Sequence, residues 1–334
     1  MDPDSTKPTL NTRREGGKAM RTVTLEEHYA TPAFMERGGP NNDAIRMVSQ
    51  LCDLDDGRIA GMDAAGIDVQ VLSIVPGIEQ LDAATAVDLA RDANERLAEA
   101  VRRHPDRFAG FAALPTAAPD TAANELERAV HDYGFKGAAI NGHTRGRYLD
   151  DGFFWPILER AQALRVPIYL HPTAPPQPVI DTYYAGNYPP NVVFSLATGA
   201  YGWHVETAIH VLRLIISGVF DRYPNLQLVI GHLGETLSFM LPRLDLRLPP
   251  ELTKLDRRIG EYLRENVHYT ISGFNFTPAF LDLLLEVGAD RIMFSADYPF
   301  GSMELARTFL DQLPVSPSDK ERIAHGNAER LLRL

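Results

Sequence analysis

A strand followed by a helix, repeated along the chain, is the pattern that most constrains the fold of this sequence. From Arg21 onward, short runs of β-branched and aromatic residues alternate with amphipathic segments, which are clearest at Ala84–His104 and Thr121–Asp132. The runs predict eight strands, at Thr22–Glu27, Val69–Ile74, Phe108–Leu114, Gly137–Asn141, Pro167–His171, Gln227–Gly231, His268–Ser272 and Arg291–Ser295. Eight such units in 334 residues predict an α/β protein with a (β/α)8 barrel.

The competing fold is a doubly wound open sheet. That fold would need a glycine-rich nucleotide-binding turn after the first strand, and the segment LEEHYATP contains no glycine. Two insertions, from Tyr29 to about Gly57 and from Pro172 to about His204, follow the first and fifth strands. Long loops of this kind are usually functional, so we expect them to wall or cover the mouth of the barrel. A surface ornament or an oligomer contact is the alternative.

Composition excludes several classes of protein. The net charge of −11 and the absence of a basic patch argue against a nucleic-acid-binding protein. One cysteine, Cys52, excludes an internal disulfide and fits a reducing compartment, so we expect a cytoplasmic protein. No apolar run is long enough to predict a membrane span. Residues 1–20 are polar and are expected to form a flexible N-terminal extension, with residues 21–334 forming a single barrel domain.

Polar residues follow several predicted strands at the point where each strand ends. They are Glu26 and His28, Asn141 and His143, His171, His232, and finally Ser295 and Asp297. Because the carboxyl ends of parallel barrel strands meet at one mouth, we expect these side chains to converge there. Taken alone, Asp297 is equally well explained as the N-cap of the next helix.

Glu26 and His28 are separated by one residue on a strand, which puts both side chains on the same face and Glu27 on the other. A carboxylate inside a barrel is costly unless it is paired or binds a metal. Together with His171 and Asp297, the set offers nitrogen and oxygen ligands suited to one divalent cation, Zn or Mn. No lysine ends the fourth strand to bridge a second ion, so one metal is expected.

His232 and Glu235 form a second candidate pair. If the chain turns helical after the sixth strand, Glu235 lies one turn beyond His232 and can orient its imidazole as an acid/base group. Arg243, further along, is a candidate clamp for a substrate carboxylate, and a solvated surface arginine is the alternative.

Several blocks resemble a known family. The segments LEEHYATP, IYLHP, WHVETAIHV, LVIGHLGETLSFMLPRLD, TISGFNF and FSADYP are similar to the amidohydrolase-related aromatic acid decarboxylases, especially those acting on γ-resorcylate and 2,3-dihydroxybenzoate. The resemblance implies a TIM barrel of the amidohydrolase type. It also implies a metal site of Glu26, His28, His171 and Asp297, with His232 and Glu235 as catalytic partners.

The function expected from this resemblance is metal-dependent, non-oxidative decarboxylation of a hydroxybenzoate-type acid. Asp297 is expected to protonate the ring carbon, with His232 as the alternative acid. Asn141, His143, Arg243 and Phe300 are expected to contact the aromatic carboxylate. No organic cofactor is expected, and the protein is expected to be a homo-oligomer, a dimer or a tetramer.

The sequence departs from the family around the expected substrate site. The segment NGHTRGRYLDD after the fourth strand is shorter than in the γ-resorcylate enzymes, and SADYP replaces a turn that usually contains tryptophan. A metal-dependent hydrolase of an amide, lactone or ester would use the same ligands and is the rival function. The Glu-x-His of the first strand, in place of His-x-His, favours the decarboxylase. A non-catalytic metal-binding protein is the third possibility.

Overall fold

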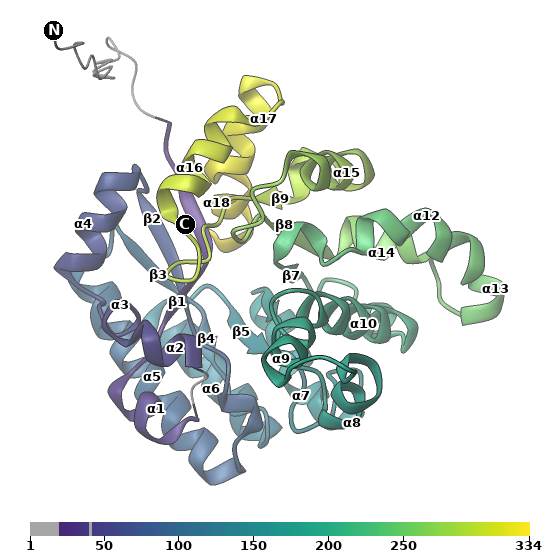
Figure 1. Cartoon of the computed structure of the whole chain (residues 1–334), viewed down its shortest axis with the longest axis horizontal. Coiled ribbons are helices and arrows are strands. Elements are labelled where there is room, and N and C mark those ends of the chain that lie inside the picture. The colour runs from purple at the N-terminus through teal and green to yellow at the C-terminus, as the bar shows by residue number, and fades with distance from the viewer. Residues whose placement is uncertain (1–19, 40–41) are drawn as a thin grey trace, which may run out of the picture.

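The computed structural model describes residues 20–39 and 42–334, so residues 1–19 of the predicted extension lie outside the described residues. Helices surround a ring of strands in Figure 1. The strands are β1 (Val23–Tyr29), β2 (Val69–Ile74), β3 (Phe108–Gly110), β4 (Ala112–Ala113), β5 (Ala138–Asn141), β6 (Ile168–His171), β7 (Leu228–Ile230), β8 (Val267–Thr270) and β9 (Ile292–Met293).

All of these strands pair in parallel, in the orders β1-β2-β3 and β4-β5-β6-β7-β8-β9. β3 and β4 are two parts of the single strand predicted at residues 108–114, interrupted at Phe111, whose N–H donates to the Leu72 carbonyl (2.9 Å). The Leu25 N–H donates to the Phe294 carbonyl (3.1 Å) and joins the first strand to the last. The predicted (β/α)8 barrel is therefore confirmed.

The helices lie where the alternating pattern placed them, with the predicted pair corresponding to α5 (Ala83–Arg103) and α6 (Pro119–Tyr133). The other long helices are α4 (Asp56–Ala65), α7 (Trp155–Leu164), α10 (Gly202–Ile216), α12 (Leu237–Arg247), α14 (Ile259–Glu265), α15 (Thr277–Val287) and α16 (Met303–Gln312). Shorter helices are α11 (Val219–Arg222), α13 (Pro250–Thr253), α17 (Pro317–Glu321) and α18 (Asn327–Leu332). Single turns are η1 (Ile78–Gln80), η2 (Gly152–Phe154), η4 (His232–Gly234), η5 (Ala289–Arg291) and η6 (Arg322–Gly326). Among the described residues, no helix has the length and apolar character needed to cross a membrane.

The two insertions are not the irregular loops that the sequence predicted. The first forms α1 (Pro32–Arg37), α2 (Asn42–Arg46) and α3 (Val48–Leu51), and residues 40–41 within it lie outside the described residues. The second forms α8 (Gln177–Val179), η3 (Ile180–Tyr184) and α9 (Pro190–Ala197), followed by the start of α10. Proline occupies the first turn of α1, α8 and α9, where its missing N–H costs nothing. These helices are too short for their periodicity to be detected.

The interior of the barrel is filled by a compact apolar cluster. Its members include Val23, Leu25, Phe111, Tyr169 and Met293, all buried. Ala328 and Leu332 of α18 belong to the same cluster, so the last helix packs against the lower part of the barrel filling. A larger apolar cluster includes buried residues of the surrounding helices, such as Leu89, Leu97 and Leu126. The barrel centre is therefore solid, and polar chemistry is confined to its ends.

Candidate metal centre and active site

A β-bulge at Glu26 creates the centre of the site. The pairing of β1 with β2 shifts between Leu25 and Glu27, and Glu26 has a left-handed backbone (φ 70°). Leu25 lies in the apolar cluster of the barrel interior, so strict alternation would turn Glu26 and His28 away from it. The bulge resets the alternation and allows both to share a centre with His171.

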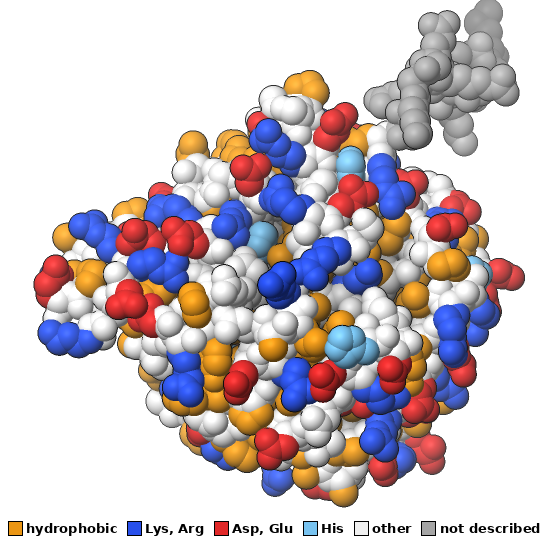
Figure 2. Space-filling view, turned by 180° about the vertical axis from the view of Figure 1, so that it is seen from behind, with side chains coloured by type: hydrophobic (Ala, Val, Ile, Leu, Met, Phe, Trp, Pro, Cys, Tyr) orange, Lys and Arg blue, Asp and Glu red, His pale blue; other side chains and the backbone are white. Residues whose placement is uncertain are grey.

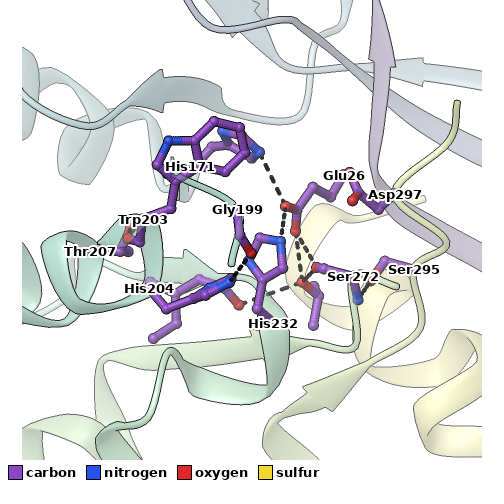
Figure 3. A network of polar contacts seen from close by, with 12 residues as sticks. Glu26, His171, Gly199, Trp203, His204, Thr207, His232, Ser272, Ser295 and Asp297 are labelled. Carbon is purple, nitrogen blue, oxygen red and sulfur yellow. Dashed lines mark hydrogen bonds and ion pairs between the residues drawn. The ribbon is translucent and has the colours of Figure 1, made fainter. Parts of the chain in front are cut away.

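Glu26, His28 and His171 meet as the ligands of a metal would. One potential ligand atom from each lies within 4.8 Å of the others, and all three residues are buried. His171 Nε2 lies 3.3 Å from Glu26 Oε1, and His28 Nε2 lies 3.3 Å from Asp297 Oδ1. Figure 3 shows Glu26 between His171 and the side of the site that holds Asp297.

The hydrogen bonding of this cluster is incomplete in the way that a metal site requires. Glu26 Oε1, both ring nitrogens of His28 and Nδ1 of His171 are buried without a hydrogen-bond partner among the described residues. Buried polar atoms are normally paired, because leaving them unpaired costs about 1–3 kcal/mol each. A divalent cation would satisfy several of them at once, so the residues fit such an ion.

Burial also keeps the histidines in the form that binds metals. It lowers the pKa of His28 to about 4 and that of His171 to about 3, so both rings are neutral near pH 7. Burial raises the pKa of Asp297 to about 7, which makes that carboxyl able to carry a proton near neutrality. A bound cation would favour the charged carboxylate instead.

The second oxygen of Glu26 is held by hydroxyl groups. Tyr169 and Ser272 donate short hydrogen bonds to Oε2, and Thr270 Oγ1 lies 3.3 Å from it. Sequence reasoning missed these three residues. Tyr169 is two residues before His171 on β6, and that spacing could have indicated that both face the barrel interior.

His232 and Glu235 contact each other as predicted, but the segment is not the helix start that the sequence suggested. Both residues, with Leu233 and Thr236, have positive φ, and α12 begins only at Leu237. His232 Nδ1 lies 2.7 Å from Glu235 Oε1. This tight turn, not a regular helix, brings the carboxylate back to the imidazole.

Glu235 also binds a histidine that the sequence analysis did not identify. His204, near the start of α10, places Nδ1 2.6 Å from Glu235 Oε2, and its Nε2 lies 3.2 Å from the Gly199 carbonyl (Figure 3). Burial opposes charge on His232, but Glu235 and Glu26 outweigh it and raise its pKa to about 10. Burial likewise opposes charge on Glu235, but His232 and His204 lower its pKa to about 2. His232 and Glu235 therefore form a buried ion pair, and His204 forms a second hydrogen bond to the Glu235 carboxylate.

Glu27, on the opposite face of β1, holds the turn that carries Asp297. Its two oxygens accept from the backbone N–H groups of Ala296 (2.8 Å) and Tyr298 (3.2 Å). Arg58, fully buried, donates to the His28 carbonyl (2.6 Å). Burial raises the pKa of Glu27 to about 8, against the lowering effect of these backbone N–H groups and of Arg58. Gln70 Nε2 donates a further hydrogen bond to Oε2 (3.3 Å). Sequence reasoning recognised only that Glu27 points away.

A cavity of about 480 Å³ opens onto the cluster. His171, His232, Asp297 and Phe300 line it together with residues from both insertions. The residues from the insertions are Asp43, Arg46, Asn191, Phe194, Ser195, Thr198, Gly199, Ala200 and Trp203. Phe300 also packs edge-on against His28, with ring centres 5.5 Å apart. Both insertions therefore wall the mouth.

Three of the residues expected to contact substrate do not line this cavity. Asn141 donates through its backbone N–H (2.8 Å) and side chain (3.0 Å) to Glu79. His143 accepts from the Gly146 N–H and bonds the Ala174 carbonyl. Arg243 is exposed on α12. The structure of one chain therefore brings Phe300 to the cavity, but not Asn141, His143 or Arg243.

The fold and this site are those of a metal-dependent amidohydrolase, and the amidohydrolase family model matches residues 40–334, so the chain belongs to that family. The chain is 40% identical to γ-resorcylate decarboxylase of Polaromonas sp. strain JS666, over 93% of this chain and 98% of the relative. A solved 2,6-dihydroxybenzoate decarboxylase in complex with 2,6-dihydroxybenzoate is 37% identical, with a TM-score of 0.85, over 94% of this chain and 100% of that chain. A dihydroxybenzoic acid decarboxylase from Polaromonas sp. JS666, with bound manganese and 2-nitroresorcinol, is 38% identical, with a TM-score of 0.85, over 94% and 97%. The resemblance seen in the sequence is confirmed.

Replacing Glu27 should disturb the metal site through the turn that carries Asp297. In Glu27→Gln, an amide N–H₂ would face a backbone N–H, and the buried donor left without an acceptor should cost about 1–3 kcal/mol of stability. Because the Asp297 turn loses an anchor, we expect metal content and turnover to fall together. Urea unfolding and elemental analysis measure the two effects.

Glu125→Gln is the matched control. Glu125 is also buried and hydrogen-bonded, but its partners are Asn94 and Arg128 and, among the described residues, it does not hydrogen-bond to the Asp297 turn. It should lose stability without losing metal. Equal metal content in wild type and Glu27→Gln would show that Glu27 does not position Asp297.

Proposed function

We propose that this protein catalyses the metal-dependent, non-oxidative decarboxylation of a hydroxybenzoate-type aromatic acid. The observation that carries the proposal is the cluster of Glu26, His28 and His171, with its unpaired ligand atoms, beside the His232–Glu235 pair, with His171 and His232 both lining the cavity. The decarboxylase relatives favour this function over hydrolysis by the same ligands.

Glu26, His28, His171 and Asp297 would hold one divalent ion, and the manganese of the solved relative supports Mn over Zn. When bound, that ion supplies positive charge that orients a substrate carboxylate and its neighbouring phenol oxygen and stabilises their negative charge. The aromatic side chains Phe194, Trp203 and Phe300 line the same cavity and supply apolar surface for a ring. The ligand thus suited to the cavity is a small aromatic carboxylate.

The chain's own residues would manage one proton. Asp297, which lies 3.3 Å from His28 and lines the cavity, would donate a proton to the ring carbon that bears the carboxylate. The bond from that carbon to the carboxyl carbon then breaks, CO2 leaves, and the bonding electrons restore the aromatic ring. His232, protonated and held by Glu235, is the alternative donor and balances charge beside Glu26.

We also propose a domain organisation and a cell compartment for this reaction. Residues 21–334 would form the one catalytic domain, and the single cysteine, Cys52, suits the cytoplasm. From the acidic composition and the proposed function, we expect neither nucleic acid nor a membrane as a partner.

Incubation of the Mn-loaded protein with 2,6-dihydroxybenzoate and 2,3-dihydroxybenzoate tests the function directly. We expect release of CO2 together with the corresponding phenol from at least one of the two. A hydroxybenzoate lacking the ortho hydroxyl should react more slowly, because it cannot absorb charge next to the protonated carbon. Hydrolysis of aryl esters or lactones without any decarboxylation would identify the rival function.

His232→Asn should keep the metal and lose turnover. His232 is not one of the proposed ligands, and a positioned acid/base group contributes about 10²–10⁴-fold to rate. Glu235→Gln should cause a smaller loss, since it acts through His232. Asp297→Asn should lower metal content and abolish turnover together.

Metal content and rate are measured on the same three preparations. Loss of the metal in His232→Asn would show that His232 is a metal ligand. A rate within a few-fold of wild type would show that His232 does not transfer the proton.

A homo-oligomer, dimer or tetramer, is proposed as well. Tyr183, Tyr188, Val192, Phe194 and Tyr201 of the second insertion are exposed, and such clusters of large apolar side chains mark protein contacts. Light scattering at micromolar concentration should give a multiple of the 37.1 kDa chain mass. Tyr183→Glu should shift the mass towards the monomer, whereas Leu285→Glu, an exposed apolar residue on α15, should not. A monomeric wild type would contradict the proposal.

A further inference from the structure

A second large cavity lies at the end of the barrel opposite the mouth. Its volume is about 640 Å³. It is lined by residues that precede strands or lie on the last helix, including Gln227 before β7, His268 early in β8 and Arg291 before β9. These positions are at the amino ends of the strands, so the cavity is separate from the candidate active site.

Four arginines line this cavity without a carboxylate to neutralise them. They are Arg165 after α7, Arg291 in η5, Arg330 in α18 and Arg333 after α18. Within the described ranges, none of the four lies within 4.0 Å of a carboxylate oxygen, although many other arginines do. Figure 2, which views the molecule from behind, shows Lys and Arg side chains gathered near the centre of that face.

The hydrogen bonds of these arginines go to neutral groups. Arg330 donates to the Asp290 carbonyl and to Asn327 Oδ1, both at 2.9 Å. Arg333 donates to the Arg165 carbonyl at 3.3 Å. Asp290 is the one acid among the lining residues, and its carboxylate lies 3.4 Å from Arg322, outside the cavity. None of the four arginines therefore forms an ion pair with a carboxylate among the described residues, and Glu265 and Asp290 act on Arg291 only from a greater distance.

His268 adds a buried imidazole to the same cavity. Its side chain is 5% exposed, and Nε2 lies 3.1 Å from both Arg291 Nη1 and Gln227 Oε1. Nδ1 is buried and has no partner among the described residues. Burial, then Arg291 and Arg330, lower the pKa of His268 to about 3, so the ring is neutral and adds no negative charge that would offset the arginines.

Like charges that gather around a cavity repel one another, and here they occur in a chain of net charge −11. An anion from solution would remove the repulsion between Arg291 and Arg330. Guanidinium groups match phosphate oxygens in pairs, and several of them favour a ligand with several anionic oxygens. The cavity volume is large enough for more than one phosphate group.

We propose that this cavity binds a multivalent phosphate anion, at a site independent of the decarboxylase chemistry. The phosphates could be free, as in inorganic pyrophosphate, or attached to a small organic molecule, because the recognition chemistry is the same. Bound anion would stabilise the amino end of the barrel, where α18 packs against its interior.

Titration calorimetry of the metal-loaded protein with pyrophosphate, at low salt, tests the proposal. We expect about one site per chain, weakened by raised salt. Arg291→Gln combined with Arg330→Gln should weaken binding at least about tenfold, since two charge-assisted contacts are lost. Arg165→Gln combined with Arg333→Gln changes the other two arginines and should also weaken it. Metal content is measured after each titration, because pyrophosphate can also chelate the active-site ion.

Arg322→Gln is the matched control, because it removes the same charge next to Asp290 but does not line the cavity. It should bind pyrophosphate as wild type does, and all variants should keep the wild-type KM for the aromatic acid. Displacement of pyrophosphate by ADP would identify an organic phosphate as the ligand class, and failure of ADP to compete would identify an inorganic one. The proposal would be overturned if wild type did not bind millimolar pyrophosphate, or if both double variants bound it as tightly as wild type does. A change of oligomeric mass in the double variants, without phosphate binding by wild type, would instead assign the arginines to a contact between copies.

Discussion

The buried carboxylate of Glu26 is the constraint on which the rest of the site depends. A charged group at the centre of a barrel mouth is stable only if both oxygens are satisfied. Tyr169 and Ser272 satisfy one oxygen, while the other is left without a hydrogen bond beside two neutral histidines. This arrangement suits a cation, and burial keeps His28 and His171 uncharged although acidic groups lie close to them.

The same strand supports the site from its outer side. Glu26 and Glu27 are neighbours in sequence, yet one faces the metal cluster and the other holds the backbone on either side of Asp297. The left-handed conformations of Glu26, His232 and Asp297 are strained, and such strain persists only where surrounding contacts enforce it. Here the contacts are Glu27, Glu235 and the hydroxyls, so the geometry of the ligands is set before any ion or substrate arrives.

The two ends of the barrel carry charged side chains of opposite sign. At the mouth, carboxylates and neutral imidazoles attract a cation, and the acid/base pair His232–Glu235 is already neutral as a pair. At the amino end, arginines without ion-pair partners among the described residues line a cavity together with the buried His268, and we propose that they attract an anion. The apolar filling of the barrel, which includes Phe111 and Met293, lies within the ring of strands and gives neither group a polar route to the other.

The sequence by itself determined the barrel and most of the candidate site. Alternating strand and helix patterns are local, and polar residues at strand ends must converge once parallel strands close, so Glu26, His28, His171 and Asp297 could be grouped without coordinates. The family relationship was readable in the same blocks. The sequence could not show the helices inside the insertions, because they are shorter than the periods that reveal helices. It also could not show that His204 binds Glu235, because His204 lies in helix α10 and not at the end of a strand. Only the tertiary structure decided that a bulge, not simple alternation, turns Glu26 inward, because a bulge is defined by the register against β2 and not by the strand's own residues.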